Sequence, residues 1–217
     1  MHEALVAFLS VFVGLFPIVN PLGMSPIFLR LTADTSQTIR SRLAWRIAAG
    51  SFFLMAASLF IGAHILAFFG LTIPAVQIGG GLVVMAAGWQ LLQQGSNVRE
   101  REKQAPSVDE ESMLSQAFFP LTMPLTVGPG TISVALTLGT RGTNADYPGW
   151  VVAGALLAVI AVSLTIYLSY RFAAGVLHYL GKTGTDVFMR LSAFILLCLG
   201  AQILTNGIAG LPIFAGK

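Results

Sequence analysis

Charged side chains are scarce in this sequence. Asp, Glu, Lys and Arg make up 10% of the 217 residues, whereas 55% are hydrophobic and the mean hydropathy is +0.80. A soluble domain usually carries about 25% charged residues, which it needs to cover a surface that faces water. The composition therefore excludes an ordinary soluble domain and predicts an integral membrane protein in contact with lipid.

Cysteine pairs and the common catalytic motifs are also missing. The single cysteine, Cys198, lies in an apolar run, so it has no partner for an internal disulfide, and no metal-ligand spacing is present. There is no Walker motif, dinucleotide fingerprint, nucleophile triad or HExxH zinc motif. No stripe of aromatic and basic residues suits nucleic acid. We therefore expect no enzymatic activity, no metal, no cofactor and no nucleic-acid partner.

Six apolar stretches are long enough to cross a bilayer, which takes roughly 20 helical residues. We expect helices, because lipid offers no partner for backbone polar groups and the alternating polarity of barrel strands is absent. The predicted fold class is thus an all-α integral membrane protein with six transmembrane helices. The stretches cover about residues 4–29, 44–68, 74–94, 114–140, 149–170 and 187–208.

Basic residues gather in alternate gaps between these stretches. Gaps one, three and five hold ten Lys and Arg residues, whereas gap two holds none and gap four holds only Arg141. Because basic residues in short loops stay in the cytoplasm, we predict that both termini lie outside. The ten are Arg30, Arg40, Arg42, Arg46, Arg99, Arg101, Lys103, Arg171, Lys182 and Arg190.

An internal repeat divides the chain. Residues 16–26 read FPIVNPLGMSP and residues 119–129 read FPLTMPLTVGP, so three prolines recur at a constant offset of 103. A second echo pairs GWQLL at 88–92 with GAQIL at 200–204. An odd number of spans per half forces the halves into opposite orientations, as in many transporters. We predict repeats at 1–96 and 113–217, joined by a cytoplasmic linker at 97–112 within one membrane domain.

The matched prolines fall inside the first and fourth spans. Proline removes a helical hydrogen bond, and the residue before it avoids helical angles. We therefore predict that both spans are broken helices, with restarts capped by Ser25 before Pro26 and by Gly128 before Pro129. Unwound backbone at membrane depth is tolerated only where protein buries it or a watery cavity borders it.

The predicted substrate site lies between these two breaks. Helix N-termini there suit a carboxylate, and unwound carbonyls suit an ammonium group or a cation. Asn20 is the leading candidate, and Asn20→Ala and Thr126→Val are expected to reduce transport more than folding. Gln77 and Arg190 are secondary candidates at matching places in the two halves. The full set is Asn20, Pro21, Gly23, Ser25, Thr122, Pro124, Thr126, Gly128, Pro129, Gly130 and Thr131.

These motifs resemble the MarC family of bacterial inner-membrane proteins, also called the NAAT family for neutral amino acid transport. The resemblance rests on Asn20-Pro21-Leu22-Gly23 followed by Pro26, on Pro124 with Gly128-Pro129-Gly130, and on Arg190-Leu191. It implies an inner-membrane location, a fold related to the LysE-type exporters and, for some members, transport of glycine and alanine. The chain departs from many relatives at Gln77, where they carry Arg, and at Ser192, where they carry Met.

The leading hypothesis is a secondary transporter of small neutral amino acids. No ATP site is present, so energy would come from exchange or from a coupling ion, proton or sodium. No Asp or Glu lies within a span, which argues against a carboxylate proton relay. Two alternatives stay open: a lipid-handling scramblase or flippase, and a membrane scaffold that transports nothing. Lipids and a small solute are the expected partners, and a homo-oligomer is compatible with the sequence.

Overall fold

The computed structural model describes residues 2–32, 35–101, 114–140 and 149–211, and within these ranges every regular element is a helix. Five helical stretches are long and apolar enough to cross a membrane, and a bent pair makes a sixth. The all-helical membrane fold predicted from composition is confirmed. In chain order the elements are α1 (His2–Val19), α2 (Pro21–Leu31), α3 (Gln37–Phe60), α4 (Gly62–Phe69), α5 (Ile73–Arg101), η2 (Ala117–Thr126), α7 (Pro129–Thr140), α8 (Gly149–Arg171) and α9 (Ala173–Ala209).

Local signals in the sequence set several helix ends. Ser36 caps α3, because its hydroxyl accepts the Ile39 N–H at 3.4 Å. Thr72 accepts the Ala75 N–H at 3.4 Å at the start of α5, and Gly70 ends α4 with φ of 65°. The α5 helix continues to Arg101, so the first residues of the expected linker are helical, and residues 102–112 lie outside the described ranges.

The first span is interrupted at a single residue. The α1 helix runs through Pro17 and ends at Val19, and α2 begins at Pro21. Between them, Asn20 has φ of 47°, the left-handed region that Asn tolerates better than most residues. The expected cap at Ser25 is wrong, because the helix restarts at Pro21, five residues before Pro26, and Pro26 lies inside α2.

The second interruption, in the fourth span, is longer. Phe119 and Met123 have extended backbone angles, and each precedes a proline through a cis peptide bond. The η2 segment is therefore a wide, irregular coil, and α7 leaves it at an angle of 69°. The α7 helix begins at Pro129, as expected, and the Ile132 N–H donates to the Gly128 carbonyl at 3.1 Å.

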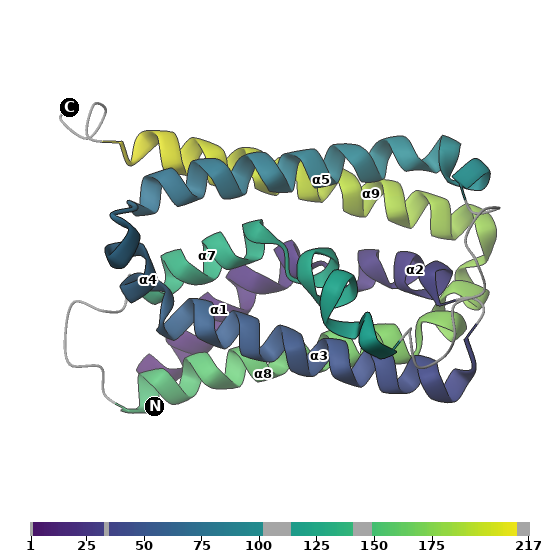
Figure 1. Cartoon of the computed structure of the whole chain (residues 1–217), viewed down its shortest axis with the longest axis horizontal. Helices are drawn as coiled ribbons and strands as arrows, with labels where there is room; N and C mark the ends of the chain where they lie inside the picture. Colours follow the sequence, from purple (N-terminus) through teal and green to yellow (C-terminus); the bar gives the residue numbers. More distant parts are fainter. Residues whose placement is uncertain (1, 33–34, 102–113, 141–148, 212–217) are drawn as a thin grey trace.

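The two halves of the chain pack against each other rather than within themselves. The most extensive helix packings pair α5 with α9, α1 with α8, and α3 with α7 and α8 (Figure 1). One buried apolar cluster draws on α1, α2, α3, η2, α7 and α8. Each half therefore completes its core with helices from the other half.

The α5 and α9 helices run antiparallel with their backbones in contact at glycines. A Cβ atom at Gly88 would lie 2.7 Å from the Leu197 nitrogen and 2.9 Å from the Ala193 oxygen. A Cβ atom at Gly200 would lie 2.5 Å from the Met85 nitrogen and 2.8 Å from the Gly81 oxygen. In both cases the two partners stand three and seven residues before the opposite glycine. This close approach needs glycine at both positions.

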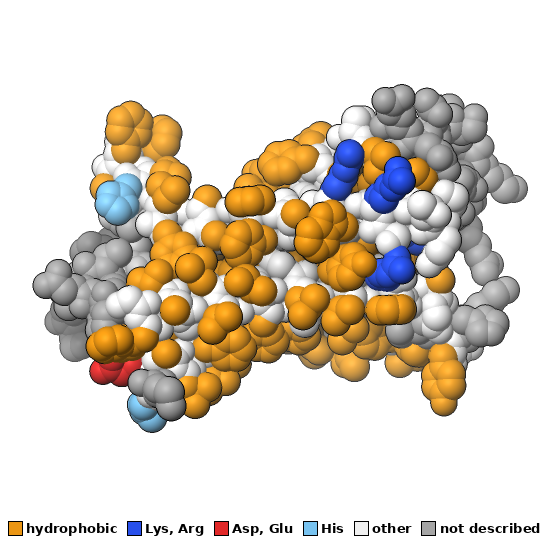
Figure 2. Space-filling model, turned by 90° about the horizontal axis from the view of Figure 1, so that it is seen from below, with side chains coloured by type: hydrophobic (Ala, Val, Ile, Leu, Met, Phe, Trp, Pro, Cys, Tyr) orange, Lys and Arg blue, Asp and Glu red, His pale blue; other side chains and the backbone are white. Residues whose placement is uncertain are grey.

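The outer surface suits a bilayer. Figure 2 shows hydrophobic side chains along the length of the visible face, with Lys and Arg side chains gathered toward one end. At that end α2 leads to α3 and α8 leads to α9, whereas α1 begins and α9 ends at the opposite end (Figure 1). The first helix therefore begins, and the last helix ends, at the same end of the molecule, as an even number of spans requires.

Candidate functional site

Asn20 holds the first interruption together through its side chain. Its Oδ1 atom accepts the Gly23 N–H at 3.2 Å, and its carbonyl oxygen accepts the Met24 N–H at 3.0 Å. Asn20 is therefore the N-cap of α2, with Pro21 as the first helical residue. Its Nδ2 atom is buried and has no hydrogen-bond partner within the described part of the chain. The Oδ1 atom of the amide therefore takes part in the helix cap, whereas the Nδ2 atom does not.

Gly23 lets α2 approach α9 at this point. A Cβ atom there would lie 2.7 Å from the Oδ1 atom of Asn20 and 2.7 Å from the Cβ atom of Ser192. Any side chain at position 23 would displace the Asn20 amide or separate the two helices. The sequence Asn20-Pro21-Leu22-Gly23 therefore forms one local unit that fixes where the amide lies.

Threonine hydroxyls support the second interruption. Thr122 donates to the Ala117 carbonyl and Thr126 to the Leu121 carbonyl, each at 2.7 Å and each across five residues. Both threonines are buried, and the prolines at positions 120 and 124 have no N–H to offer these turns. The tandem sequence FPLT-MPLT thus satisfies its own carbonyls inside the bundle.

A chain of buried contacts links the two interruptions. The hydroxyls of Thr126 and Tyr170 lie 2.9 Å apart, and the Tyr170 ring stacks on Phe28 with centroids 4.4 Å apart. Tyr170 and Phe28 are fully buried. Through Tyr170 of α8, the η2 segment is linked to Phe28 of α2, seven residues beyond the restart at Pro21. The Thr126 hydroxyl therefore bonds two protein groups, and its contact with Tyr170 is a structural link that the sequence did not predict.

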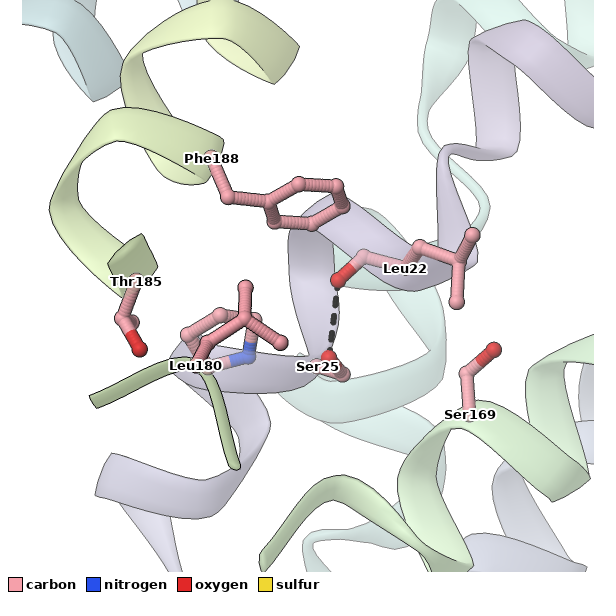
Figure 3. A pocket seen from close by; sticks show the side chains of 7 residues that line it. Leu22, Ser25, Ser169, Leu180, Thr185 and Phe188 are labelled. Atoms are coloured by element: carbon pink, nitrogen blue, oxygen red, sulfur yellow. Dashed lines mark hydrogen bonds between the residues drawn. The ribbon is translucent and has the colours of Figure 1, made fainter. Parts of the chain in front are cut away.

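A cavity of about 180 Å³ lies beside the α2 restart. Figure 3 shows the Phe188 ring above Leu22, with Ser169 facing the same space from α8. Two of its hydroxyls are committed to their own helices: Ser25 donates to the Leu22 carbonyl and Thr185 to the Gly181 carbonyl, each at 2.7 Å. The lining carries no charged side chain and comprises Leu22, Ser25, Pro26, Ser169, Leu180, Thr185 and Phe188.

The predicted site residues fall into two groups. Asn20, Pro21, Gly23 and Ser25 surround the α2 restart, and Ser25 alone of the predicted set lines the cavity. The members from the fourth span form the opposite break and the start of α7, where Gly130 packs on Val84. That second group is Thr122, Pro124, Thr126, Gly128, Pro129, Gly130 and Thr131.

The two secondary candidates, Gln77 and Arg190, lie in different surroundings. Gln77 donates from Nε2 to the Thr137 hydroxyl at 3.2 Å, which joins α5 to α7 of the opposite half. Nearby, the Ser133 hydroxyl donates to the Val76 carbonyl at 2.9 Å. Arg190 is exposed on α9. Gln77 therefore links the two halves of the chain, whereas Arg190 lies on the surface.

Sequence reasoning missed the cavity residues on α8 and α9. Ser169 and Phe188 stand in apolar runs, and Thr185 stands in the polar gap between two of them, so nothing in the pattern singles them out. The one usable signal is Gly181, whose φ of 66° bends α9 and brings Leu180 to the cavity wall. In the described ranges, no three His, Cys, Asp or Glu side chains come together in a way that could hold a metal ion.

This architecture defines a polytopic α-helical membrane protein with two interrupted spans packed into its core. The family model for MarC family integral membrane proteins matches residues 5–212, so the chain belongs to the MarC family. It is 32% identical over 201 residues to the inner membrane protein MarC of Citrobacter koseri and 31% identical to that of Escherichia coli O1:K1 / APEC. Each match covers 90% of this chain and 91% of the relative. No solved structure gives a significant match.

Proposed function

We propose that the chain is a secondary transporter of small neutral amino acids, with its site at the α2 restart between two inverted three-helix halves. The observation that carries the proposal is the pair of interruptions, at matched repeat positions, linked through Tyr170 and bordered by a small uncharged cavity. Discontinuous helices that place their N-termini near a substrate are a recurrent device in secondary transporters. The names of the two relatives mention no substrate, so the proposal depends on the site.

The symmetry of the packing supports inverted halves. Adding 112 to Gly88, Met85 and Gly81 gives Gly200, Leu197 and Ala193, and these six residues make the reciprocal backbone contacts between α5 and α9. A two-fold axis between antiparallel helices produces such reciprocity. The breaks match as well, because Asn20 and Met123 occupy equivalent positions, each before a proline. An axis of this kind would let the two halves exchange roles in an inward-open and an outward-open state.

The α2 restart supplies the chemistry for a zwitterion. The N-terminal end of a helix carries partial positive charge and attracts a carboxylate. The unused Nδ2 atom of Asn20 adds a donor at the same place. The last carbonyl oxygens of α1, next to it, are the groups that would face an ammonium group. The apolar cavity one turn further along α2 would then receive the side chain of the amino acid.

The lipid-handling alternative fits less well. A route for lipid phosphate would need basic side chains along a groove open to the bilayer, and the cavity lining holds none. By volume, an apolar cavity of about 150 Å³ accommodates benzene, so this one suits roughly six non-hydrogen atoms rather than a lipid headgroup. The scaffold alternative predicts a core without cavities at the breaks, and the cavity beside the α2 restart disagrees with that prediction.

Ligand-induced stabilisation in detergent tests the proposal. A ligand at 100 times its Kd stabilises the folded state by about 2.7 kcal/mol, so glycine or alanine at high concentration should raise the Tm of the wild-type protein. Asn20→Ala should lower the basal Tm, since it removes a cap, and should also abolish the ligand-induced shift. The control Asn206→Ala, at an exposed position on α9, should keep the shift. Absence of a shift with every neutral amino acid in the wild-type protein would contradict the proposal.

A further inference from the structure

The cavity beside α2 is larger and more apolar than glycine or alanine requires. It has a volume of about 180 Å³, and its walls are formed by Leu22, Pro26, Leu180 and Phe188 together with three hydroxyl-bearing residues. Glycine has no side chain to place there, and alanine has one methyl group. The space left over would be an empty apolar cavity next to the proposed site, so its size and chemistry indicate what it accepts.

The hydroxyl groups of the lining do not make the cavity polar. The Ser25 hydroxyl donates to Leu22 and the Thr185 hydroxyl to Gly181, and both residues are buried. A charged carboxylate or ammonium group would lose its hydration in this cavity without gaining a charged partner, which is unfavourable. An aliphatic group would gain free energy for each methylene removed from water. The lining therefore accepts a hydrocarbon group and rejects the charged ends of a zwitterion.

Position along α2 relates this cavity to the amide of Asn20. Leu22 follows the N-cap by two residues, and Ser25 and Pro26 lie on the next turn. A helical turn rises about 5.4 Å, which is the scale of the distance between the carboxylate and the branch of a leucine side chain. An amino acid held by its polar end at the restart would thus place its side chain in the cavity.

We propose that the cavity is a side-chain pocket and that the substrates of this transporter include branched aliphatic amino acids, of the valine and leucine class. This inference rests on the proposed transport function and adds the substrate class to it. Phe188 of α9 and the small Ser169 of α8 line the pocket from different helices (Figure 3). The pocket has room for about four to six carbon atoms, so leucine fits and phenylalanine is at the limit.

Uptake of labelled glycine, leucine and phenylalanine into proteoliposomes tests the pocket. Ser169→Leu fills it, so leucine uptake should fall at least about tenfold relative to glycine uptake, since a methylene in an apolar pocket is worth roughly 10–200-fold. Phe188→Ala enlarges it and should raise phenylalanine uptake relative to leucine uptake. The ratio of two substrates in one preparation corrects for any difference in the amount of folded protein.

Two matched controls change the same helices away from the cavity. Leu168→Phe adds bulk on α8 at a residue that is exposed, and Phe194→Ala removes the same ring from an exposed position on α9. Neither should alter the ratios. If wild-type protein transports glycine and alanine but not leucine, or if both pocket variants leave the ratios unchanged, the inference is wrong and the proposed function stands. If the wild-type protein transports no amino acid, the proposed function itself fails.

Discussion

Replacing Thr126 by valine removes one hydroxyl and leaves two buried groups without a partner. The hydroxyl donates to the Leu121 carbonyl at 2.7 Å and lies 2.9 Å from the Tyr170 hydroxyl, and all of this is shielded from solvent. An orphaned buried group costs about 1–3 kcal/mol. In a membrane protein the cost falls toward the lower end, because the denatured state also finds partners. We expect Thr126→Val to lower the free energy of unfolding by about 2–3 kcal/mol.

Tyr170→Phe should cost less, because it leaves Thr126 bonded to Leu121. The loss is then one net hydrogen bond, about 1 kcal/mol, while the ring can keep its stacking on Phe28. In the double variant no Tyr170 hydroxyl remains to be orphaned. The two changes should therefore be less than additive, with a coupling free energy of about 1 kcal/mol.

A double-mutant cycle measured by reversible unfolding in detergent checks this reasoning. Tyr167→Phe is the control on the same helix; its ring meets Trp45 edge-on with centroids 5.9 Å apart. That substitution should change stability by no more than about 0.5 kcal/mol. Equal costs for the two single variants at Thr126 and Tyr170, together with strict additivity, would refute the buried link between the interruptions.

Three further outcomes follow from the fold. Reporter fusions at residue 105 and at the C-terminus should place the first in the cytoplasm and the second outside, and a cytoplasmic C-terminus would exclude the inverted repeat. Gly88→Ala should lower the Tm markedly, because its Cβ atom would meet the α9 backbone. At Gly79 a Cβ atom would have nothing within 4 Å, so Gly79→Ala should leave the free energy of unfolding unchanged or raise it by up to about 1 kcal/mol. Equal effects of the two substitutions on the Tm would rule out the glycine contact. Asn20→Asp keeps the α2 cap but replaces the Nδ2 donor, so stability in detergent should change less than alanine binding, and unchanged binding would show that the donor is not used.

The membrane-crossing helices follow from the sequence because lipid leaves few choices. Six apolar stretches of sufficient length, separated by short polar gaps, can only form helices that cross the bilayer. The structure has interruptions at Asn20 and within the η2 segment, both next to prolines of the repeat. Asn20, the leading candidate, indeed lies at the break, where its amide caps α2.

The sequence pattern does not decide which of two candidate residues caps the restarted helix in the first span. Ser25 and Asn20 are both good caps followed by proline, and the structure uses Asn20 because Asn tolerates φ of 47° while its Oδ1 reaches Gly23. Pro17 and Pro26 lie inside helices, and the Leu22 carbonyl, which Pro26 has no N–H to bond, accepts the Ser25 hydroxyl at 2.7 Å. The role of Thr126 was not predicted because its partner, Tyr170, comes from α8 and is 44 residues away.

The cavity could not be predicted for a similar reason. Its walls come from three helices that are far apart in the sequence, and their residue types recur throughout the apolar runs. Only packing decides that Ser169 faces this space while its neighbour Tyr170 faces the core. A pocket between helices is a tertiary feature, and helical periodicity alone cannot locate it.

Transport is tested most directly by counterflow in proteoliposomes that contain only the purified chain. Vesicles loaded with unlabelled alanine and diluted into labelled alanine should accumulate the label transiently, and unlabelled alanine in the outside medium should abolish the accumulation. Asn20→Ala should reduce the initial rate at least about tenfold, because the donor and cap at the α2 restart are lost together. Labelled alanine that enters the wild-type vesicles no faster than it enters protein-free vesicles, with or without a proton or sodium gradient, would contradict the account.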